Sequence, residues 1–350
     1  MTILKTLYSD RRRMPSSGVV PDIADSKLLE NILAADLSPK TKTNYESCAR
    51  ALSAKAEKSI AHIMVHPETY IPLIRKWYEK DTTYKVSLSF IMGIFKYNKQ
   101  LQIDHVSAFE KWGAAFKSAD GAVNDRYESN APTERQLQGY VPYDQIIKAR
   151  DELPPGSINR LLLGMYTYLR PMRCEYARVA IYKVKPPSMK KDSKDSKDTK
   201  YSKDTKDSKD TKDSKKEIED NYILLNRGSG RLIIRHFKTR KHHEGYDIAI
   251  PKPLMEDLKA SLMETPRDWL FVNANGNPYS PALFSQWTMR VFKSVFKKPL
   301  TVALIRHSFI NTLDFNQLSV AEKKEIALSM GHTVGTQDRY RLIFDNDTCT

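Results

Sequence analysis

The feature that most constrains this sequence is the run at residues 190–216, which repeats Lys, Asp and Ser or Thr with a period of three. Almost no side chain in the run is apolar, so ordering it would cost backbone entropy without burying hydrophobic surface. The run contains 11 Lys and 7 Asp, a net charge of +4, so the other residues keep +11 of the formal +15. We predict a disordered insertion with folded chain on both sides.

The composition is that of a folded protein that binds a polyanion. With 350 residues and 40% hydrophobic content, the chain can bury sizeable cores. A pI near 9.4 favours nucleic acid as the partner over an acidic membrane surface. No apolar run is long enough to span a bilayer and the N-terminal residues do not resemble a signal peptide, so we expect a soluble, intracellular protein without membrane association.

The first half of the chain predicts a helical domain over residues 20–117. In its "LSPKTKTNYESCARALSAKAEK", Ser38 suits an N-cap and Pro39 suits the first helical position. The polar stretch 118–136 lacks periodic apolar residues and is predicted to be an interdomain linker. Residues 1–19 are predicted to form a flexible basic arm. Its "RRR" suits a DNA arm, a nuclear-import signal or, as the default, a solvated charge run.

The second half, residues 137–350, predicts a mixed domain. "INRLLLGMYTYL" reads as a buried helix before the insertion, and "YILLNRGSGRLIIRHFKTRKHHEGYDIAIP" reads as short strands separated by turns after it. Helices then return, one of them opening with a capping box of Ser319 and Glu322. The predicted fold class is therefore mainly α with a small antiparallel β-sheet.

Four polar clusters stand out in this second domain. They are "RPMRCEYARV" (170–179), "HFKTRKHHEG" (236–245), "LIRHSF" (304–309) and "MGHTVGTQDRY" (330–340). Each is weak alone, but in this order they resemble the catalytic motifs of the tyrosine recombinases, or phage integrases, which share an active site with type IB topoisomerases. The resemblance covers most of the chain outside the insertion. It implies a two-domain architecture, in which a helical core-binding domain and an α+β catalytic domain clamp DNA.

The resemblance also implies a set of catalytic residues: Arg173, Lys238, Arg306, His332 and Tyr340. Glu175 would be a buried acid that supports the first arginine, and Lys241 competes with Lys238 for the role of the lysine. The Gly-His pair precedes the tyrosine by eight residues, as the family pattern requires. One position departs from that pattern, because Ala303 stands where the family usually has His or Lys three residues before the second arginine.

These residue types suit the chemistry of a phosphodiester. Two guanidiniums, which are always charged, can hold the non-bridging oxygens and stabilise a pentavalent transition state, with His332 adding a hydrogen bond. Tyr340 would attack phosphorus, and a lysine would protonate the leaving 5′ oxygen. The covalent phosphotyrosine keeps the energy of the bond, so rejoining needs no ATP, and we expect no metal or other cofactor.

Other readings of these residues remain open. Arg173 alone could be a structural ion-pair partner of Glu175, and a lone tyrosine near a C-terminus is usually filler. A metal cluster is conceivable from His236, His242, His243 and Glu244, although a hairpin offers no second ligand group. The three cysteines, Cys48, Cys174 and Cys349, have neither metal-type spacing nor an even number, which indicates ordinary thiols.

The sequence therefore predicts a site-specific DNA recombinase that forms a 3′-phosphotyrosyl intermediate. The expected partner is double-stranded DNA, with the protein assembled on it as a homo-oligomer, a tetramer. The simple repeat agrees with a viral or mobile-element integrase. The alternatives are a type IB topoisomerase-like or resolvase activity with the same nucleophile, and a catalytically inactive DNA-binding protein, which Ala303 favours. A purely helical adaptor without a DNA role is poorly compatible with the basic charge.

Overall fold

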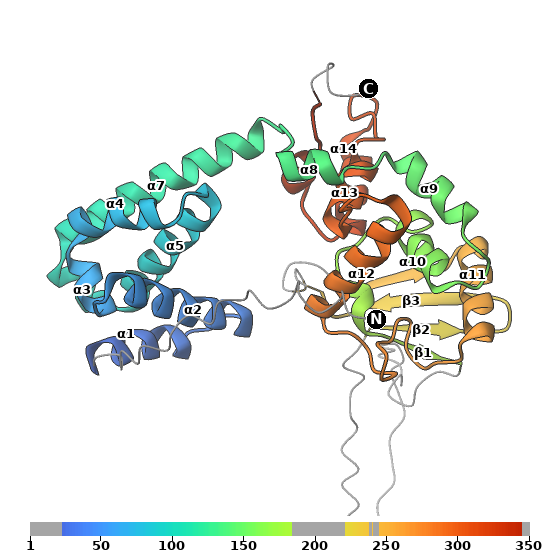
Figure 1. Cartoon of the computed structure of the whole chain (residues 1–350), viewed down its shortest axis with the longest axis horizontal. Helices are drawn as coiled ribbons and strands as arrows, with labels where there is room; N and C mark the ends of the chain where they lie inside the picture. The colour runs from blue at the N-terminus through green and yellow to red at the C-terminus, as the bar shows by residue number, and fades with distance from the viewer. Residues whose placement is uncertain (1–22, 184–220, 238–239, 241–244, 345–350) are drawn as a thin grey trace, which may run out of the picture. The chain divides into compact units, whose positions relative to one another are not determined.

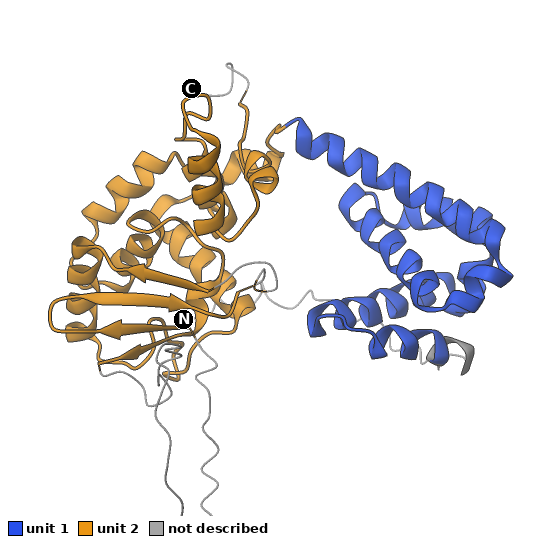
Figure 2. Cartoon of the chain, turned by 180° about the vertical axis from the view of Figure 1, so that it is seen from behind, with its two compact units in different colours: residues 1–129 blue, residues 130–350 orange. Residues whose placement is uncertain are grey.

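The computed structural model describes residues 23–183, 221–237, 240 and 245–344, which form two compact units divided between Ser129 and Asn130 (Figure 2). Several predicted features lie outside the described residues: the basic arm at 1–19, the insertion at 190–216, and Lys238, Lys241, His242, His243, Glu244 and Cys349. None of the helices that the structure describes is long and apolar enough to cross a membrane.

Unit 1 is helical, as the periodicity predicts (Figure 1). Its helices are α1 (Ile23–Ala34), α2 (Pro39–Ala56), α3 (Ile60–Val65), α4 (Pro67–Trp77), α5 (Asp81–Tyr97), α6 (Lys99–Asp104) and α7 (Val106–Glu128). Helix α2 begins as predicted, because the Ser38 hydroxyl accepts a hydrogen bond from the Thr41 backbone N–H and Pro39 occupies the first turn. The fully buried Trp112 donates its indole N–H to the Met64 carbonyl and so joins α7 to α3.

The connection between the units is shorter than the predicted linker, residues 118–136. Helix α7 continues to Glu128, and α8 begins at Glu134 with a capping box between Thr133 and Gln136. The reason is that Ala119 and Val123 are one helical turn apart and both buried, which keeps the polar stretch helical. The low average hydrophobicity of residues 118–128 therefore gave no sign that Ala119 and Val123 form a buried apolar pair on one face of a helix.

Unit 2 packs helices around a four-stranded sheet (Figure 1). Its elements are α8 (Glu134–Gly139), α9 (Tyr143–Glu152), α10 (Ile158–Thr167), the 3₁₀ helix η1 (Glu175–Arg178), β1 (Val179–Tyr182), β2 (Asn221–Leu225), β3 (Gly230–Ile234), β4 (Tyr246–Ala249), α11 (Lys252–Glu264), α12 (Pro281–Phe296), α13 (Val302–Ile310), α14 (Val320–Ser329) and α15 (Val334–Asp338). The expected capping box of Ser319 and Glu322 opens α14. The mainly helical fold class is confirmed.

The sheet is mixed, however, and not wholly antiparallel. Strands β2, β3 and β4 form the predicted antiparallel meander, but β1 pairs with β2 in parallel, with Val179 opposite Asn221. A parallel pair needs a long connection between its strands. The chain provides one here, because β1 and β2 are separated by residues 183–220, which include the insertion.

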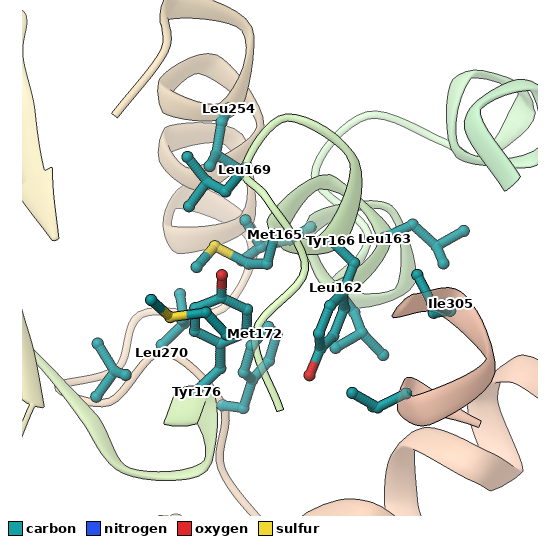
Figure 3. Close-up of a cluster of buried hydrophobic side chains, with 14 of the residues drawn as sticks. Leu162, Leu163, Met165, Tyr166, Leu169, Met172, Tyr176, Leu254, Leu270 and Ile305 are labelled. Atoms are coloured by element: carbon teal, nitrogen blue, oxygen red, sulfur yellow. The ribbon is translucent and has the colours of Figure 1, made fainter. Parts of the chain in front are cut away.

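The core of unit 2 fixes the segments that carry the candidate site residues. Strand β2 is buried on both faces, with Ile223 packed into the main cluster and Tyr222 into a smaller one on the opposite face. Figure 3 shows the main cluster, which includes Met172 and Tyr176, Tyr166 of α10 and Ile305 of α13. The rings of Tyr166 and Tyr176 are in contact, with centroids 5.2 Å apart. Arg173 and Arg306 are therefore each adjacent in sequence to a side chain anchored in this core.

Candidate active site

Arg306 is the most deeply buried charged residue of the candidate site, with 0% of its surface exposed. Helix α13 carries it, and this helix begins where the Thr301 hydroxyl accepts a hydrogen bond from the Leu304 N–H. One terminal nitrogen of Arg306, Nη1, donates to the carbonyls of Pro171 and Met330 at 2.7 and 2.9 Å. Burial lowers the pKa of this guanidinium, and its other terminal nitrogen contacts His332.

His332 is buried and its protonation state follows from its partner. Its Nδ1 lies 2.8 Å from Nη2 of Arg306, and a guanidinium can only donate, so Nδ1 accepts and the ring proton is on Nε2. Burial, together with the charges of Arg306 and Arg173, lowers the pKa of His332 to about 3. Within the described part of the chain Nε2 has no hydrogen-bond partner. At neutral pH this neutral ring therefore keeps an N–H donor that is not used.

Arg173 lies in the bend just before η1, where its backbone carbonyl accepts the Tyr166 hydroxyl at 2.9 Å. Its Nη1 donates to the Gly331 carbonyl at 3.2 Å. The adjacent Met330 carbonyl accepts from Arg306, so both arginines are bonded to the same turn. That turn has Gly331 at φ +69°, a left-handed conformation that a residue with a Cβ rarely adopts.

Tyr340 follows α15, and its half-buried ring lies near the guanidinium of Arg306 and the ring of His332. The guanidinium carbon of Arg306 is 4.8 Å from the ring centroid, and the ring of His332 is 5.2 Å away, centroid to centroid. Burial raises the pKa of the phenol, but the charges of Arg306 and Arg173 and the hydrogen bonds from both together outweigh burial and lower the pKa below its ordinary value. The phenol is thus the group in this arrangement whose ionised form is favoured by its neighbours.

The structure therefore brings together four of the five predicted residues: Arg173, Arg306, His332 and Tyr340. The fifth, Lys238, lies outside the described residues, as does its competitor Lys241. Glu175 is half-buried rather than buried, and its Oε2 has no hydrogen-bond partner in the described part of the chain. Ala303 is exposed one turn before Arg306 on α13. Among the described residues no group of His, Cys, Asp and Glu is arranged to hold a metal ion.

Two further residues support the site, and the sequence motifs did not point to them. The buried Asn221 donates to the carbonyls of Glu175 and His236 and accepts from the backbone N–H groups of Arg235 and His236. It therefore ties the Arg173 segment to the end of β3, just before Lys238 in sequence. Tyr246 of β4 donates its hydroxyl to the Leu328 carbonyl at 2.8 Å, at the end of α14.

Two more supporting residues are His307 of α13 and Asn311, which caps the C-terminus of this helix. His307 contacts the backbone and ring of Tyr340, and Asn311 bonds the backbone of Leu342. His307 was visible in the "RHSF" motif, although nothing in the sequence assigned it a partner. Apart from the ring contact of His307 with Tyr340, these contacts are to main-chain atoms of distant segments, which residue types do not record.

Comparisons with known proteins bear on the fold of the chain. No protein-family model and no curated protein sequence matches the chain. Two crystal structures of a lambda integrase dimer bound to a COC′ core site align with a TM-score of 0.54 and 14% identity. One alignment covers 93% of this chain and 77% of the integrase chain, and the other covers 92% and 96%.

A crystal structure of XerA recombinase aligns over 93% of this chain and 94% of its own, at 14% identity and a TM-score of 0.37. The score with XerA is too low to establish a shared fold by itself. The lambda integrase alignments, at their low identity, establish the fold and not the activity. The chain therefore has the two-domain fold of the tyrosine recombinases, with a helical unit followed by an α+β unit.

Proposed function

We propose that this protein is a site-specific DNA recombinase or integrase that cuts and rejoins DNA through Tyr340. The observation that carries the proposal is the position of the Tyr340 ring against Arg306 and His332, together with the hydrogen bond from Arg173 to the carbonyl of Gly331, which precedes His332. These are cationic and N–H donor groups around one oxygen nucleophile, which suits attack on a phosphodiester.

The proposed reaction uses each of these groups in turn. The guanidiniums of Arg173 and Arg306 hold the non-bridging oxygens of the phosphate, and the free Nε2–H of His332 donates to one of them. The phenol of Tyr340 loses its proton and forms a bond to phosphorus, while the bond from phosphorus to the 5′ oxygen breaks. The leaving oxygen takes a proton, for which the sequence offers Lys238. The product is a 3′-phosphotyrosyl DNA with a free 5′ hydroxyl.

The reaction is reversible because the phosphotyrosyl ester retains the energy of the bond that it replaces. A 5′ hydroxyl from the same or another strand attacks it, releases Tyr340 and restores a phosphodiester. Exchange of both strands between two duplexes needs four such cuts and therefore four chains. We propose a tetramer on DNA for this reason, held mainly by contacts from Lys and Arg to phosphates.

The proposed DNA substrate implies an intracellular protein, and an integrase carried by a virus or other mobile element agrees with the simple repeat at 190–216. The helices of unit 1 and the α+β unit 2 would both hold the duplex, as the resemblance to the tyrosine recombinases implies. Binding should then weaken steeply with added salt, because each neutralised phosphate releases counterions.

The experiment that tests this function traps the protein on a nicked suicide DNA substrate, from which the cleaved 5′ fragment diffuses away. A covalent adduct should form with the wild-type chain and not with the Tyr340→Phe variant, and the DNA-bearing peptide should contain Tyr340 joined to a 3′ phosphate. An adduct on another residue, or a 5′ linkage, would contradict the proposal.

Two rival functions give different results in the same assay. A catalytically inactive DNA-binding protein, which the exposed Ala303 favours, would bind the substrate with salt-dependent affinity and form no adduct. A topoisomerase-like enzyme would form the adduct and relax supercoiled plasmid, but would not join two separate DNA sites. A two-site joining assay separates that activity from recombination.

A further inference from the structure

Two side chains, that of His307 in α13 and that of Asn311 at the C-cap of this helix, hydrogen-bond the main chain at and after Tyr340. Nδ1 of His307 lies 2.6 Å from the Tyr340 carbonyl oxygen. One turn further along, the Asn311 amide donates to the Leu342 carbonyl at 2.9 Å and its oxygen accepts from the Leu342 N–H at 2.9 Å. Residues four apart on a helix share a face, so the two side chains grip alternate residues of the segment that follows α15.

The tautomer of His307 follows from its two partners. A carbonyl only accepts, so Nδ1 carries the ring proton and donates to Tyr340. Nε2 then accepts, and it faces Nε2 of Gln136 at 3.4 Å. The amide of Gln136 is oriented to donate, because its oxygen already accepts the Thr133 N–H in the capping box of α8. His307 is thus held by α8 on one side and holds Tyr340 on the other.

The ring of His307 also limits where the phenol can lie. Its centroid is 4.8 Å from the centroid of the Tyr340 ring, and the Tyr340 ring also contacts the ring of His332. The preceding residue, Arg306, lies 4.8 Å from the same Tyr340 ring and bonds His332. Two consecutive residues of α13 therefore contact Tyr340. Arg306 contacts its ring, and His307 contacts its ring and its backbone carbonyl.

We propose that His307, assisted by Asn311, is a positioning residue that holds the Tyr340 nucleophile at the phosphate bound by Arg306. This role rests on the proposed function. It differs from the roles that the sequence motifs imply, because His307 touches no reacting atom and acts only through the main chain and ring of Tyr340. A displacement of about 1 Å at a reacting atom is enough to slow a reaction about 100-fold.

The test uses two amides of different length in place of the imidazole. In His307→Asn the side-chain nitrogen lies about where Nδ1 lay and can still donate to the Tyr340 carbonyl. In His307→Gln the amide reaches the position of Nε2 instead. We expect adduct formation on the nicked suicide DNA to slow about 10- to 100-fold in His307→Gln, and His307→Asn to recover most of that loss. DNA affinity at constant salt should stay within about two-fold in both variants.

A purely structural role for His307 would give another pattern. Both variants would lose adduct formation equally, in proportion to the fraction unfolded in a thermal melt, and that result would overturn the proposal. A parallel loss of rate and DNA affinity would overturn it too. The dependence of the cleavage rate on pH is a second readout. In His307→Gln the phenol should lie farther from the two guanidiniums, so the midpoint of the pH–rate profile should move to higher pH. It should not move in His307→Asn.

Failure of the proposed function looks different from failure of this inference. No adduct with the wild-type chain, or an adduct that persists in Tyr340→Phe, would end both the recombinase function and any role of His307 in it. A wild-type adduct on Tyr340 with equal rates in the Asn and Gln variants would end the positioning role alone.

Discussion

The guanidinium carbon of Arg306 lies 4.8 Å from the centroid of the Tyr340 ring, although 34 positions separate them in the sequence. Arg306 is fully buried, and one of its terminal nitrogens donates hydrogen bonds to the carbonyls of Pro171 and Met330. These contacts set the position of the guanidinium, and the Tyr340 ring lies against it. Such preorganisation is the usual source of electrostatic catalysis.

Replacing Arg306 with lysine should damage both the reaction and the fold. A lysine keeps the charge but not the planar fork that reaches two carbonyls and His332. We expect adduct formation to fall about 100-fold or more, and urea unfolding to show a loss of roughly 1–3 kcal/mol. The control is Arg231→Lys, because Arg231 is exposed and forms an ion pair with Asp247 at the surface. This variant should change the free energy of unfolding by less than about 0.5 kcal/mol.

The pH dependence of cleavage should report the charge of Arg173. Arg173 lowers the pKa of Tyr340, so removal of its charge raises that pKa, and less phenolate is present at a given pH. In Arg173→Gln the midpoint of the rate profile between about pH 6 and pH 10 should move to higher pH. Arg170→Gln, in the same motif, alters contacts with Ser329 and Glu325 and should leave the midpoint in place. Equal midpoints in all three proteins would contradict this assignment.

Stability at acid pH should depend on His332. Its pKa is about 3 in the folded chain and about 6.5 when unfolded, so between these values only the unfolded chain takes up the proton. Stability is therefore complete above about pH 6.5 and declines as the pH falls toward 3. His332→Asn keeps an acceptor for Arg306 and does not titrate. Urea unfolding at several pH values should show a shallower decline in this variant than in the wild type, while its adduct formation slows for lack of the Nε2–H donor.

Asn221 should tolerate no change of its amide. In Asn221→Asp one oxygen still accepts from Arg235 and His236, but the other faces the carbonyls of Glu175 and His236. We expect a loss of roughly 2–4 kcal/mol of unfolding free energy in urea titrations at neutral pH. The matched control is Asn273→Asp, since the Asn273 oxygen accepts from two backbone N–H groups and the new carboxylate can do the same. Similar losses in the two variants would rule out this account.

The repeat at 190–216 should be dispensable for cleavage. It contains none of the candidate catalytic residues, and replacement by a short Gly-Ser link still leaves a connection long enough for the parallel pairing of β1 with β2. The shortened protein should melt at a similar temperature and form the Tyr340 adduct at a similar rate. A folded but inactive product would show that the repeat takes part in the reaction.

Local features of the fold were predictable from sequence because their causes are local. Ser38 with Pro39 and Ser319 with Glu322 define helix starts within a few residues, and the structure has those starts. The order of motifs likewise predicted which of Arg173, Arg306, His332 and Tyr340 belong together. The resemblance to the tyrosine recombinases supplied this expectation; the structure brings the four residues together, and their catalytic roles stay a prediction.

The tertiary structure alone decided the pairing of distant segments. The parallel register of β1 with β2 joins strands on either side of the insertion, and no local pattern records it. The helical state of residues 118–128 accompanies the burial of Ala119 in the core of unit 1 and of Val123 one turn later. Both outcomes are set by packing, which overrides weak local preferences.

The supporting contacts of the site show the same division more sharply. The sequence determined that a histidine follows Arg306, but only the fold brings His307 to the carbonyl of Tyr340, and only the fold brings the Asn221 amide to Glu175 and His236. The partners are main-chain N–H and C=O groups, which every residue carries. A sequence can therefore specify reactive side chains by type, whereas the scaffold that orients them appears only once the chain is folded.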